Sequence, residues 1–184
     1  MNLLSNETVV VKMLKPVKKE KVRRELMTLA AVKESPNVIK LIDQVADPSN
    51  VTPSFVFEYV KNQDFRALYP NLTKQSIKMY IYQILSGLEH AHSRGIIHRD
   101  IKPGNVLMNG KDQTAKIIDW GLADFYMPSK KFNCRVASRY FKAPELLLAN
   151  HYYDYQLDIW STGCMLAGMM FAKEPFFKGQ DNDD

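Results

Sequence analysis

Two short polar stretches carry the residue types best suited to chemistry. The first, residues 97–105, reads Ile-His-Arg-Asp-Ile-Lys-Pro-Gly-Asn, and the second, residues 119–121, reads Asp-Trp-Gly and begins fourteen residues after Asn105. Asp100 and Asn105 are too close in the chain to lie on separate elements, so a structured loop must present both. Carboxylates, an amide and a lysine suit phosphoryl transfer, because catalysis of that reaction is mostly positioning and charge neutralisation. The alternative is a polar turn between two apolar segments that merely contains charges.

The two stretches, H-R-D-x-K-P-x-N followed by D-W-G, resemble the catalytic loop and the metal-binding turn of the protein kinases. The resemblance implies that Asp100 orients the attacking hydroxyl and accepts its proton, and that Lys102 faces the transferring phosphate. It also implies that Asn105 and Asp119 hold the magnesium ions that bridge the phosphate oxygens. Four positions in register favour this interpretation over the polar turn.

A strand and a helix are predicted ahead of these motifs. Residues 8–14 form a β-branched run that predicts a strand carrying Lys12. The helix is predicted to begin near Pro16 and to end before Pro36. Its apolar side chains repeat at helical spacing at Val22, Leu26 and Leu29. The arrangement matches the kinase lysine–glutamate pair, which implies that Lys12 grips the α- and β-phosphates of a nucleotide and pairs with Glu25. Each residue alone is commonplace, so this pair depends on the downstream motifs.

Two further strands are predicted at residues 38–45 and 55–60, separated by turn-forming residues. The resemblance places the hinge at the end of the second strand, where backbone groups meet the adenine edge and Phe57 lies at the back of the pocket. The alternative interpretation is that Phe57 is simply an aromatic residue of the hydrophobic core. Besides Lys12 and Glu25, the resemblance assigns these residues to the nucleotide site: Val10, Phe57, Glu58, Val60, Leu107, Ile118 and Asp119.

The clearest helix is predicted at residues 73–92, capped by Thr73 and followed by Gly95. Its predicted apolar stripe consists of Ile77, Ile81, Ile84, Leu85 and Leu88. A short hairpin is predicted from residues 106–108 and 115–118 around Asn109-Gly110. The uncharged, apolar-rich run 159–172 is too short for a membrane span and is typical of a buried helix. At the start of that helix, the resemblance implies that Asp158 accepts hydrogen bonds from the catalytic loop.

Five segments narrow the resemblance to the catalytic α subunit of casein kinase II: residues 9–12, 14–19, 118–123, 135–142 and 173–177. Tryptophan in the D-x-G turn is uncommon among kinases and characteristic of this family. The likeness covers essentially all 184 residues. It implies an α+β, two-lobed kinase-like fold with the small lobe in residues 1–60 and the large lobe in residues 61–184. It also implies a serine/threonine kinase that uses ATP or GTP with Mg²⁺ and prefers acidic contexts.

The resemblance also assigns residues to macromolecular partners. Basic side chains that would meet acidic substrates are Arg135, Arg139 and Lys142 in the segment before Ala143-Pro144-Glu145, and Lys18, Lys19 and Lys21 near the first helix. For the helix group, a solvated charged face is the favoured alternative. Contacts to a regulatory β subunit would fall partly on Val11, Pro48 and Val56.

Composition sets wider bounds. A net charge of +5 and a pI near 9.1 favour an anionic partner. A nucleic-acid-binding protein is disfavoured because no recognisable nucleic-acid motif is present. Two cysteines, and an N-terminal stretch without the pattern of a signal peptide, predict a reducing compartment, cytoplasmic or nuclear, with no membrane association.

The first glycine is Gly87, so no Gly-rich phosphate-covering loop precedes Lys12. The resemblance therefore implies a fold without the first strands of the small lobe and without the C-terminal helices of the large lobe, including the arginine expected to pair with Glu145. Three explanations stay open: a fragment, a misassembled gene product, or a degenerate relative. The alternative function is a catalytically silent kinase-fold protein that binds a regulatory subunit or an acidic partner.

Overall fold

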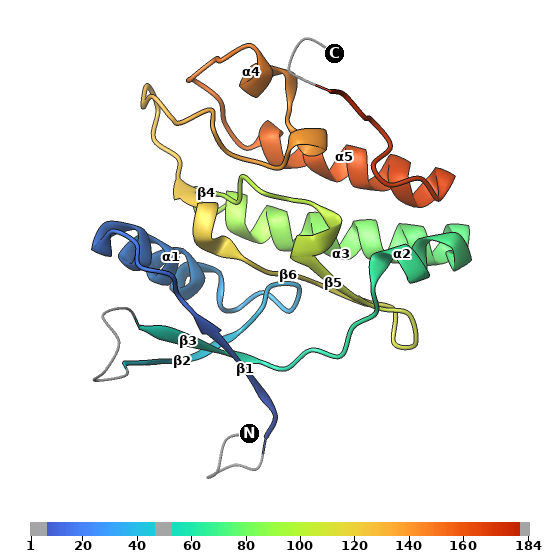
Figure 1. Ribbon diagram of the computed structural model, residues 1–184, viewed down its shortest axis with the longest axis horizontal. Helices are drawn as coiled ribbons and strands as arrows, with labels where there is room; N and C mark the ends of the chain where they lie inside the picture. Colours follow the sequence, from blue (N-terminus) through green and yellow to red (C-terminus); the bar gives the residue numbers. More distant parts are fainter. Residues whose placement is uncertain (1–6, 47–52, 181–184) are drawn as a thin grey trace.

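The computed structural model describes residues 7–46 and 53–180, which form an α+β fold of two lobes (Figure 1). The small lobe contains a three-stranded antiparallel sheet in the order β1-β3-β2 and one helix, α1. The strands are β1 (Val9–Met13), β2 (Leu41–Val45) and β3 (Ser54–Glu58). The predicted strand at residues 8–14 is confirmed, and its register places Lys12 opposite Phe55 of the central strand.

The strand predicted at residues 38–45 is shorter than expected, because its first residues pair elsewhere. Ile39 N–H donates to Ile117 O (3.0 Å), and Ile117 N–H donates to Asn37 O (2.8 Å). Val38 thus forms a parallel bridge to Ile117 of the large lobe, and β2 begins only at Leu41. These backbone hydrogen bonds tie the two lobes together.

Helix α1 (Lys19–Val32) begins later than the position of Pro16 suggested, because Lys18 has an extended backbone (φ −57°, ψ 137°). Its buried side chains are Glu25, Thr28, Leu29 and Val32. The helix contacts the turn Trp120–Leu122 and strand β7 (Asp124–Phe125), which follow the D-W-G motif. The side chain of Glu25 is therefore presented to the segment that carries Asp119.

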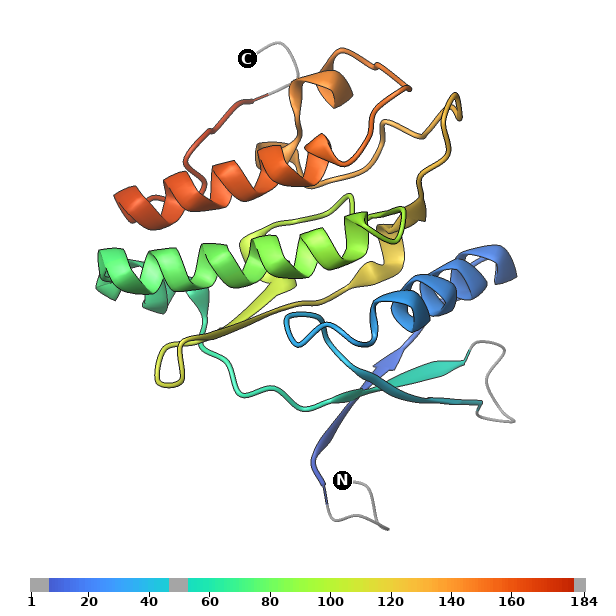
Figure 2. The ribbon, with the colours of Figure 1, turned by 180° about the vertical axis from the view of Figure 1, so that it is seen from behind.

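The large lobe is built on two long helices, α3 (Lys74–His92) and α5 (Gln156–Phe171), which lie side by side in both ribbon views (Figures 1 and 2). The hairpin of β5 (Val106–Asn109) and β6 (Thr114–Ile117) packs against α3. Short elements complete the lobe: α2 (Phe65–Leu68), β4 (Ile96–Ile97), which pairs with β7, and α4 (Pro144–Leu147).

The predicted cap of α3 is confirmed, since Thr73 Oγ1 accepts a hydrogen bond from Ser76 N–H (3.1 Å). Beyond the end of the helix, Gly95 has a φ of 72°, a conformation that glycine adopts without strain. The predicted apolar stripe is wrong at one position, because Leu85 is 39% exposed whereas Ile84 and Leu88 are buried. Tyr80, which is fully buried and donates to Asn109 O, occupies the inner face of the helix with them.

The β5–β6 hairpin has a longer turn than the tight Asn-Gly turn that the sequence suggested. Residues 110–113 connect the strands, and Asn109 Oδ1 accepts hydrogen bonds from the N–H groups of Lys111 (2.9 Å) and Asp112 (3.4 Å). The Asn109 side chain thus shapes a four-residue loop.

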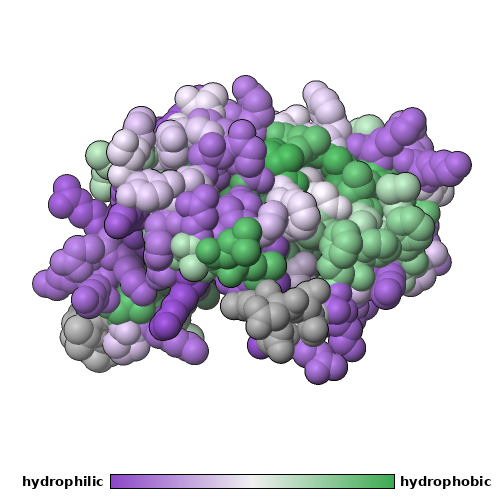
Figure 3. Space-filling model, turned by 90° about the horizontal axis from the view of Figure 1, so that it is seen from above, coloured by the Kyte–Doolittle hydropathy of each residue, from purple (hydrophilic) through white to green (hydrophobic). Residues whose placement is uncertain are grey.

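The apolar run at residues 159–172 forms most of α5, but only one side of this helix is buried. Met165 and Met169 are buried, whereas Ile159, Trp160, Met170 and Phe171 are 45–64% exposed. Figure 3 shows a broad hydrophobic area at the end of the molecule that α5 occupies. Among the described residues, no helix is long and apolar enough to cross a bilayer.

Candidate active site

A cleft of about 450 Å³ separates the lobes. It is lined by Val10, Lys12, Ile39, Phe57, Glu58, Tyr59, Val60, Asn62, Gly104, Asn105, Leu107, Ile118 and Asp119. All but one of the residues predicted for the nucleotide site lie on its wall. The exception, Glu25, lies behind the wall and reaches it through Lys12.

Lys12 joins the small lobe to the D-W-G turn. Its Nζ lies 2.8 Å from Glu25 Oε1 on α1 and 2.7 Å from Asp119 Oδ1. Burial alone would lower the pKa of Lys12, but the hydrogen bonds to the two carboxylates raise it overall. For Asp119, burial acts to raise the pKa, and the hydrogen bond from Lys12 outweighs burial and lowers it. Lysine and carboxylate are therefore both charged at neutral pH.

The backbone aims the Asp119 side chain into the cleft. Asp119 has a left-handed backbone (φ 57°, ψ 73°). Two residues later, a Cβ on Gly121 would lie 3.3 Å from Glu25 Oε2, so this turn packs closely against the Glu25 side chain.

Next to this turn, buried His98 accepts a hydrogen bond from Asp100 N–H at Nδ1 (3.2 Å). Its Nε2 therefore carries the proton and donates to Ile118 O (3.0 Å). Burial lowers the pKa of His98, which keeps the ring neutral in this role.

Asp158 of α5 holds the catalytic loop from below. Its two carboxylate oxygens accept hydrogen bonds from the N–H groups of His98 and Arg99, each at 2.8 Å. His92 Nε2 of α3 lies 2.9 Å from the same carboxylate. Because Arg99 has a left-handed backbone (φ 68°), the loop needs such support to hold its strained conformation. The Asp158 contacts match the expectation from the sequence.

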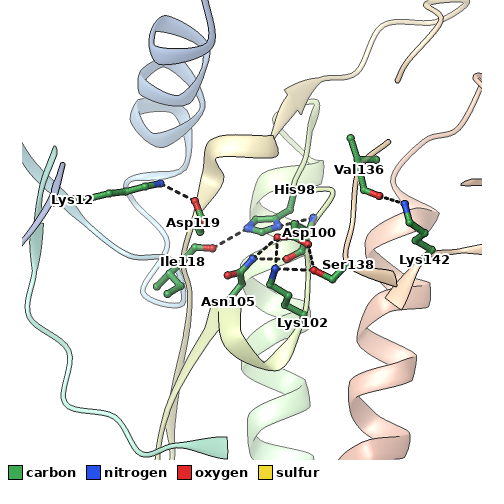
Figure 4. Close-up of polar contacts among 10 residues, drawn as sticks. All are labelled: Lys12, His98, Asp100, Lys102, Asn105, Ile118, Asp119, Val136, Ser138 and Lys142. Carbon is green, nitrogen blue, oxygen red and sulfur yellow. Dashed lines mark hydrogen bonds and ion pairs between the residues drawn. The ribbon is translucent and has the colours of Figure 1, made fainter. Parts of the chain in front are cut away.

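The Asp100 carboxylate lies at the centre of a compact polar cluster (Figure 4). Its Oδ2 accepts hydrogen bonds from Lys102 Nζ and Asn105 Nδ2, both at 2.8 Å. Its Oδ1 accepts one from Ser138 Oγ at 3.0 Å, and Lys102 Nζ donates to Ser138 Oγ at 2.7 Å. Oδ1 accepts one hydrogen bond from the described residues, which leaves a lone pair for a substrate hydroxyl. In Figure 4, Ile118 and Asp119 lie between Lys12 and this cluster.

Asn105 and Asp119 provide oxygen atoms suited to a magnesium ion. The Asn105 amide nitrogen donates to both the backbone and the carboxylate of Asp100, so its Oδ1 is the atom left for a metal. Mg²⁺ is commonly held by one or two protein oxygens together with substrate phosphates and water. Phosphate oxygens and water would complete the coordination. The described part of the chain contains no group of three or more His, Cys, Asp or Glu that could hold a metal ion.

A protein-family model described as the protein kinase domain matches residues 1–184. The chain belongs to the protein kinase family. Protein kinases generally use ATP and Mg²⁺ and act on protein substrates, which agrees with a cleft that brings Lys12, Asp119 and Asn105 to its wall.

The predicted substrate residues of the kinase lie in two groups. Arg135 and Arg139 are exposed on either side of Ser138, and Arg139 Nη1 donates to Gln180 O (2.9 Å). Lys142 is half-buried and donates to Val136 O (2.6 Å), as Figure 4 shows. Burial lowers the pKa of Lys142, against the opposing effects of Cys134 and Asp100.

The second group, near the start of α1, is solvent-facing. Lys18, Lys19 and Lys21 are exposed, and Lys18 precedes the helix instead of lying within it. Their geometry fits the solvated charged face as well as a substrate contact.

Two of the three residues predicted to contact a regulatory subunit, Val11 and Val56, lie in the described part of the chain. Val11 and Val56 are direct partners on the antiparallel strands β1 and β3, so their side chains share one face of the sheet. Val11 is 51% exposed. Pro48 lies outside the described residues.

Glu145 lies in the first turn of the short helix α4, directly after Pro144, and its side chain is only partly buried. Water can therefore solvate the charge, and no buried unpaired carboxylate results.

Several site residues were not predicted from the sequence. Ser138 contacts both Asp100 and Lys102, although it is 38 residues from Asp100. Arg99 is also engaged: its guanidinium lies 3.2 Å from Asp124, a carboxylate that also meets Arg24 and Lys130. Sequence spacing cannot reveal either contact, because both depend on how the segment after D-W-G returns to the catalytic loop.

Proposed function

We propose that this kinase is a serine/threonine kinase of the casein kinase II type, which transfers the γ-phosphate of ATP or GTP to Ser or Thr in acidic contexts. The observation that carries the proposal is the triangle of Asp100, Lys102 and Ser138, with separations of 2.7–3.0 Å. In this triangle a proton acceptor, Asp100, and a cation, Lys102, lie together, as phosphoryl transfer to a serine or threonine hydroxyl requires.

The residues divide the work of phosphoryl transfer. Bound Mg²⁺ would be held by Asn105 and Asp119 and would supply charge neutralisation at the phosphates. Lys12, fixed by Glu25, binds the phosphates on the small-lobe side. Asp100 orients the substrate hydroxyl and accepts its proton as the new oxygen–phosphorus bond forms, while the bond between the γ-phosphorus and the β,γ-bridging oxygen breaks and the nucleoside diphosphate leaves. Lys102 neutralises charge on the transferring group.

A preference for acidic substrates is supported by the position of the basic side chains. Arg135 and Arg139 flank Ser138, which itself touches the proposed proton acceptor. Their positive charges would attract a carboxylate close to the substrate hydroxyl in sequence. Exposed pairs of this kind act chiefly on encounter and specificity and weaken with salt.

The substrate test compares a serine peptide in an acidic context with a neutral one. Reversing Arg135 and Lys142 to glutamate should raise the KM for the acidic peptide far more than for the neutral peptide, and added salt should narrow the difference. The exposed pair Lys18→Glu and Lys19→Glu tests the second basic group in the same assay. Equal losses on both peptides would show that these residues serve folding instead of recognition.

The second candidate is a catalytically silent kinase-fold protein that binds a regulatory subunit or an acidic partner. The exposed side chains of Lys18, Lys19 and Lys21 favour it, because they would suit an acidic partner without any phosphoryl transfer. Titration with Mg-ATP separates the candidates: binding supports the kinase, and no binding supports the silent protein. A parallel titration with duplex DNA tests the nucleic-acid alternative.

A further inference from the structure

The linker between the lobes, residues 59–62, forms one wall of the cleft. Tyr59, Val60 and Asn62 line the cleft directly. In both ribbon views this segment passes from β3 alongside the β5–β6 hairpin toward α2 (Figures 1 and 2). Both ends of the linker are fastened to that hairpin by contacts that the catalytic motifs do not involve.

The first attachment is an ion pair between the lobes. Glu58 Oε1, at the end of β3, lies 2.6 Å from Lys116 Nζ on β6. The same oxygen accepts a hydrogen bond from Lys40 N–H (2.9 Å), and Glu58 N–H donates to Lys40 O (3.1 Å). The side chains of Glu58 and Lys116 are 28% and 24% exposed, so the pair is partly shielded from solvent.

The second attachment uses the backbone. Gln63 N–H donates to Met108 O (2.8 Å), and Gln63 Oε1 accepts a hydrogen bond from Gly110 N–H (2.9 Å). A Cβ at position 110 would collide with Gln63 Oε1, so only glycine leaves room for this contact. The linker is therefore held at residue 58 and at residue 63, and the intervening residues have little freedom to change their distance from the hairpin.

The position of Lys116 on β6 places it on the nucleotide side of the hairpin. Lys116 is the direct partner of Leu107, and Ile118 follows it by two residues, so the three side chains share one face. Leu107 and Ile118 line the cleft. Lys116 is not among the lining residues and instead reaches the Glu58 carboxylate at the edge of the cleft.

We propose that Lys116 is a positioning residue for nucleotide binding. Its ion pair with Glu58, together with the Gln63 contacts, holds residues 59–62 at a fixed distance from the cleft floor formed by Leu107 and Ile118. The linker is thereby ordered before the ligand binds. The affinity is then not lowered by the entropy cost of ordering the linker. The proposal rests on the proposed function of the cleft as a nucleotide site.

The test is the dissociation constant of a fluorescent ATP analogue with Mg²⁺, measured on the protein and on Lys116→Met. The variant should bind about 3- to 10-fold more weakly, the range expected for loss of one partly shielded ion pair. Lys116→Arg should bind like the unchanged protein, because it preserves the charge. Lys78→Met, at an exposed lysine of α3, is the matched control and should have no effect.

Charge reversal sharpens the test. Glu58→Lys and Lys116→Glu should each weaken binding, and the two changes together should recover part of the loss. If Lys116→Met does not fold, Glu58→Gln answers the same question, since its amide oxygen still accepts the Lys40 hydrogen bond and only the charge is lost.

Thermal unfolding of each variant separates positioning from stability. A lowered Tm with an unchanged dissociation constant would show that the pair only stabilises the fold, and would overturn the proposal while leaving the proposed function intact. Failure of the unchanged protein to bind Mg-ATP would overturn both.

Discussion

The charges of Lys12 and Asp119 depend on each other. Asp119 has a pKa below its ordinary value of 3.8, so its contribution to stability is present above that value and is lost as the pH falls through the lowered pKa. Lys12 has a pKa above 10.5, so its contribution is present below that value and is lost as the pH rises through the raised pKa. The contact is therefore stabilising throughout the neutral range. It also keeps Asp119 ionised and able to bind a metal.

Removing the lysine charge should release this coupling. In Lys12→Met, the pKa of Asp119 should rise, because the hydrogen bond that lowers it is gone and the effect of burial remains. An NMR titration of the Asp119 carboxylate carbon measures the change, with exposed Lys15→Met as the control. An unchanged Asp119 titration would show that Lys12 does not set its charge.

Ser138 contacts the catalytic loop but lies outside the H-R-D-x-K-P-x-N and D-W-G motifs. Ser138→Ala should slow phosphoryl transfer about 10- to 100-fold, because a hydrogen bond to a charged group contributes roughly 1.5–3 kcal/mol. Ser138→Thr keeps the hydroxyl and should retain most of the rate. Steady-state kinetics with a serine peptide check both variants. Equal losses in the alanine and threonine variants would point to a steric role.

At the scale of elements, α3 and β6 meet at a glycine. A Cβ on Gly87 would lie 3.0 Å from Ile117 Cδ1 and 3.1 Å from Asn37 O. Both atoms belong to residues whose backbones are hydrogen-bonded across the lobes, Ile117 N–H to Asn37 O. The close approach leaves no room for a side chain at position 87.

Gly87→Ala should therefore destabilise the protein by about 1–3 kcal/mol, the usual cost of overpacking. Gly163 is the matched control, because it lies inside α5 with nothing within 4 Å of a Cβ. Gly163→Ala should stabilise the helix by roughly 0.5–1 kcal/mol. Urea denaturation measures both changes. Loss of stability in both variants, or in neither, would contradict the packing argument.

Elements set by local patterns were the ones that could be predicted. The strand around Lys12 and the helix capped by Thr73 follow from β-branched residues and from capping with apolar periodicity, and the structure contains both. The start of β2 could not be predicted, because residues 37–39 pair with Ile117, a long-range choice that the local sequence does not encode.

The same distinction applies to the site. Asp100, Lys102 and Asn105 are close in the chain, so a motif places them together. The contacts of Ser138 with Asp100 and of Lys116 with Glu58 join residues 38 and 58 positions apart. Such contacts depend on the path of the whole chain, so local sequence patterns could not predict them.

For the molecule as a whole, coverage of the phosphates is a requirement separate from the catalytic side chains. Residues 1–184 contain no glycine before Gly87. A chimera that adds a Gly-rich hairpin ahead of Val9 should bind Mg-ATP more tightly and turn over faster, because backbone N–H groups then cover the phosphates and exclude water. The same hairpin with alanine in place of glycine is the control. Equal ATP affinity in the chimera and in residues 1–184 would contradict this view.

Exposed apolar side chains on α5 predict that residues 1–184 associate in solution. A contiguous hydrophobic area favours association unless it is covered. Association of residues 1–184 should therefore increase with protein concentration, which analytical ultracentrifugation would measure.

Phosphoryl transfer by Asp100→Asn tests the proposed catalytic role of Asp100 most directly. At saturating Mg-ATP and an acidic serine peptide, transfer of labelled γ-phosphate should fall by about 10²–10⁴-fold, because the amide cannot accept the hydroxyl proton. ATP affinity should be unchanged, since Asp100 is not among the residues that line the nucleotide cleft. A transfer rate close to that of the unchanged protein would contradict this role.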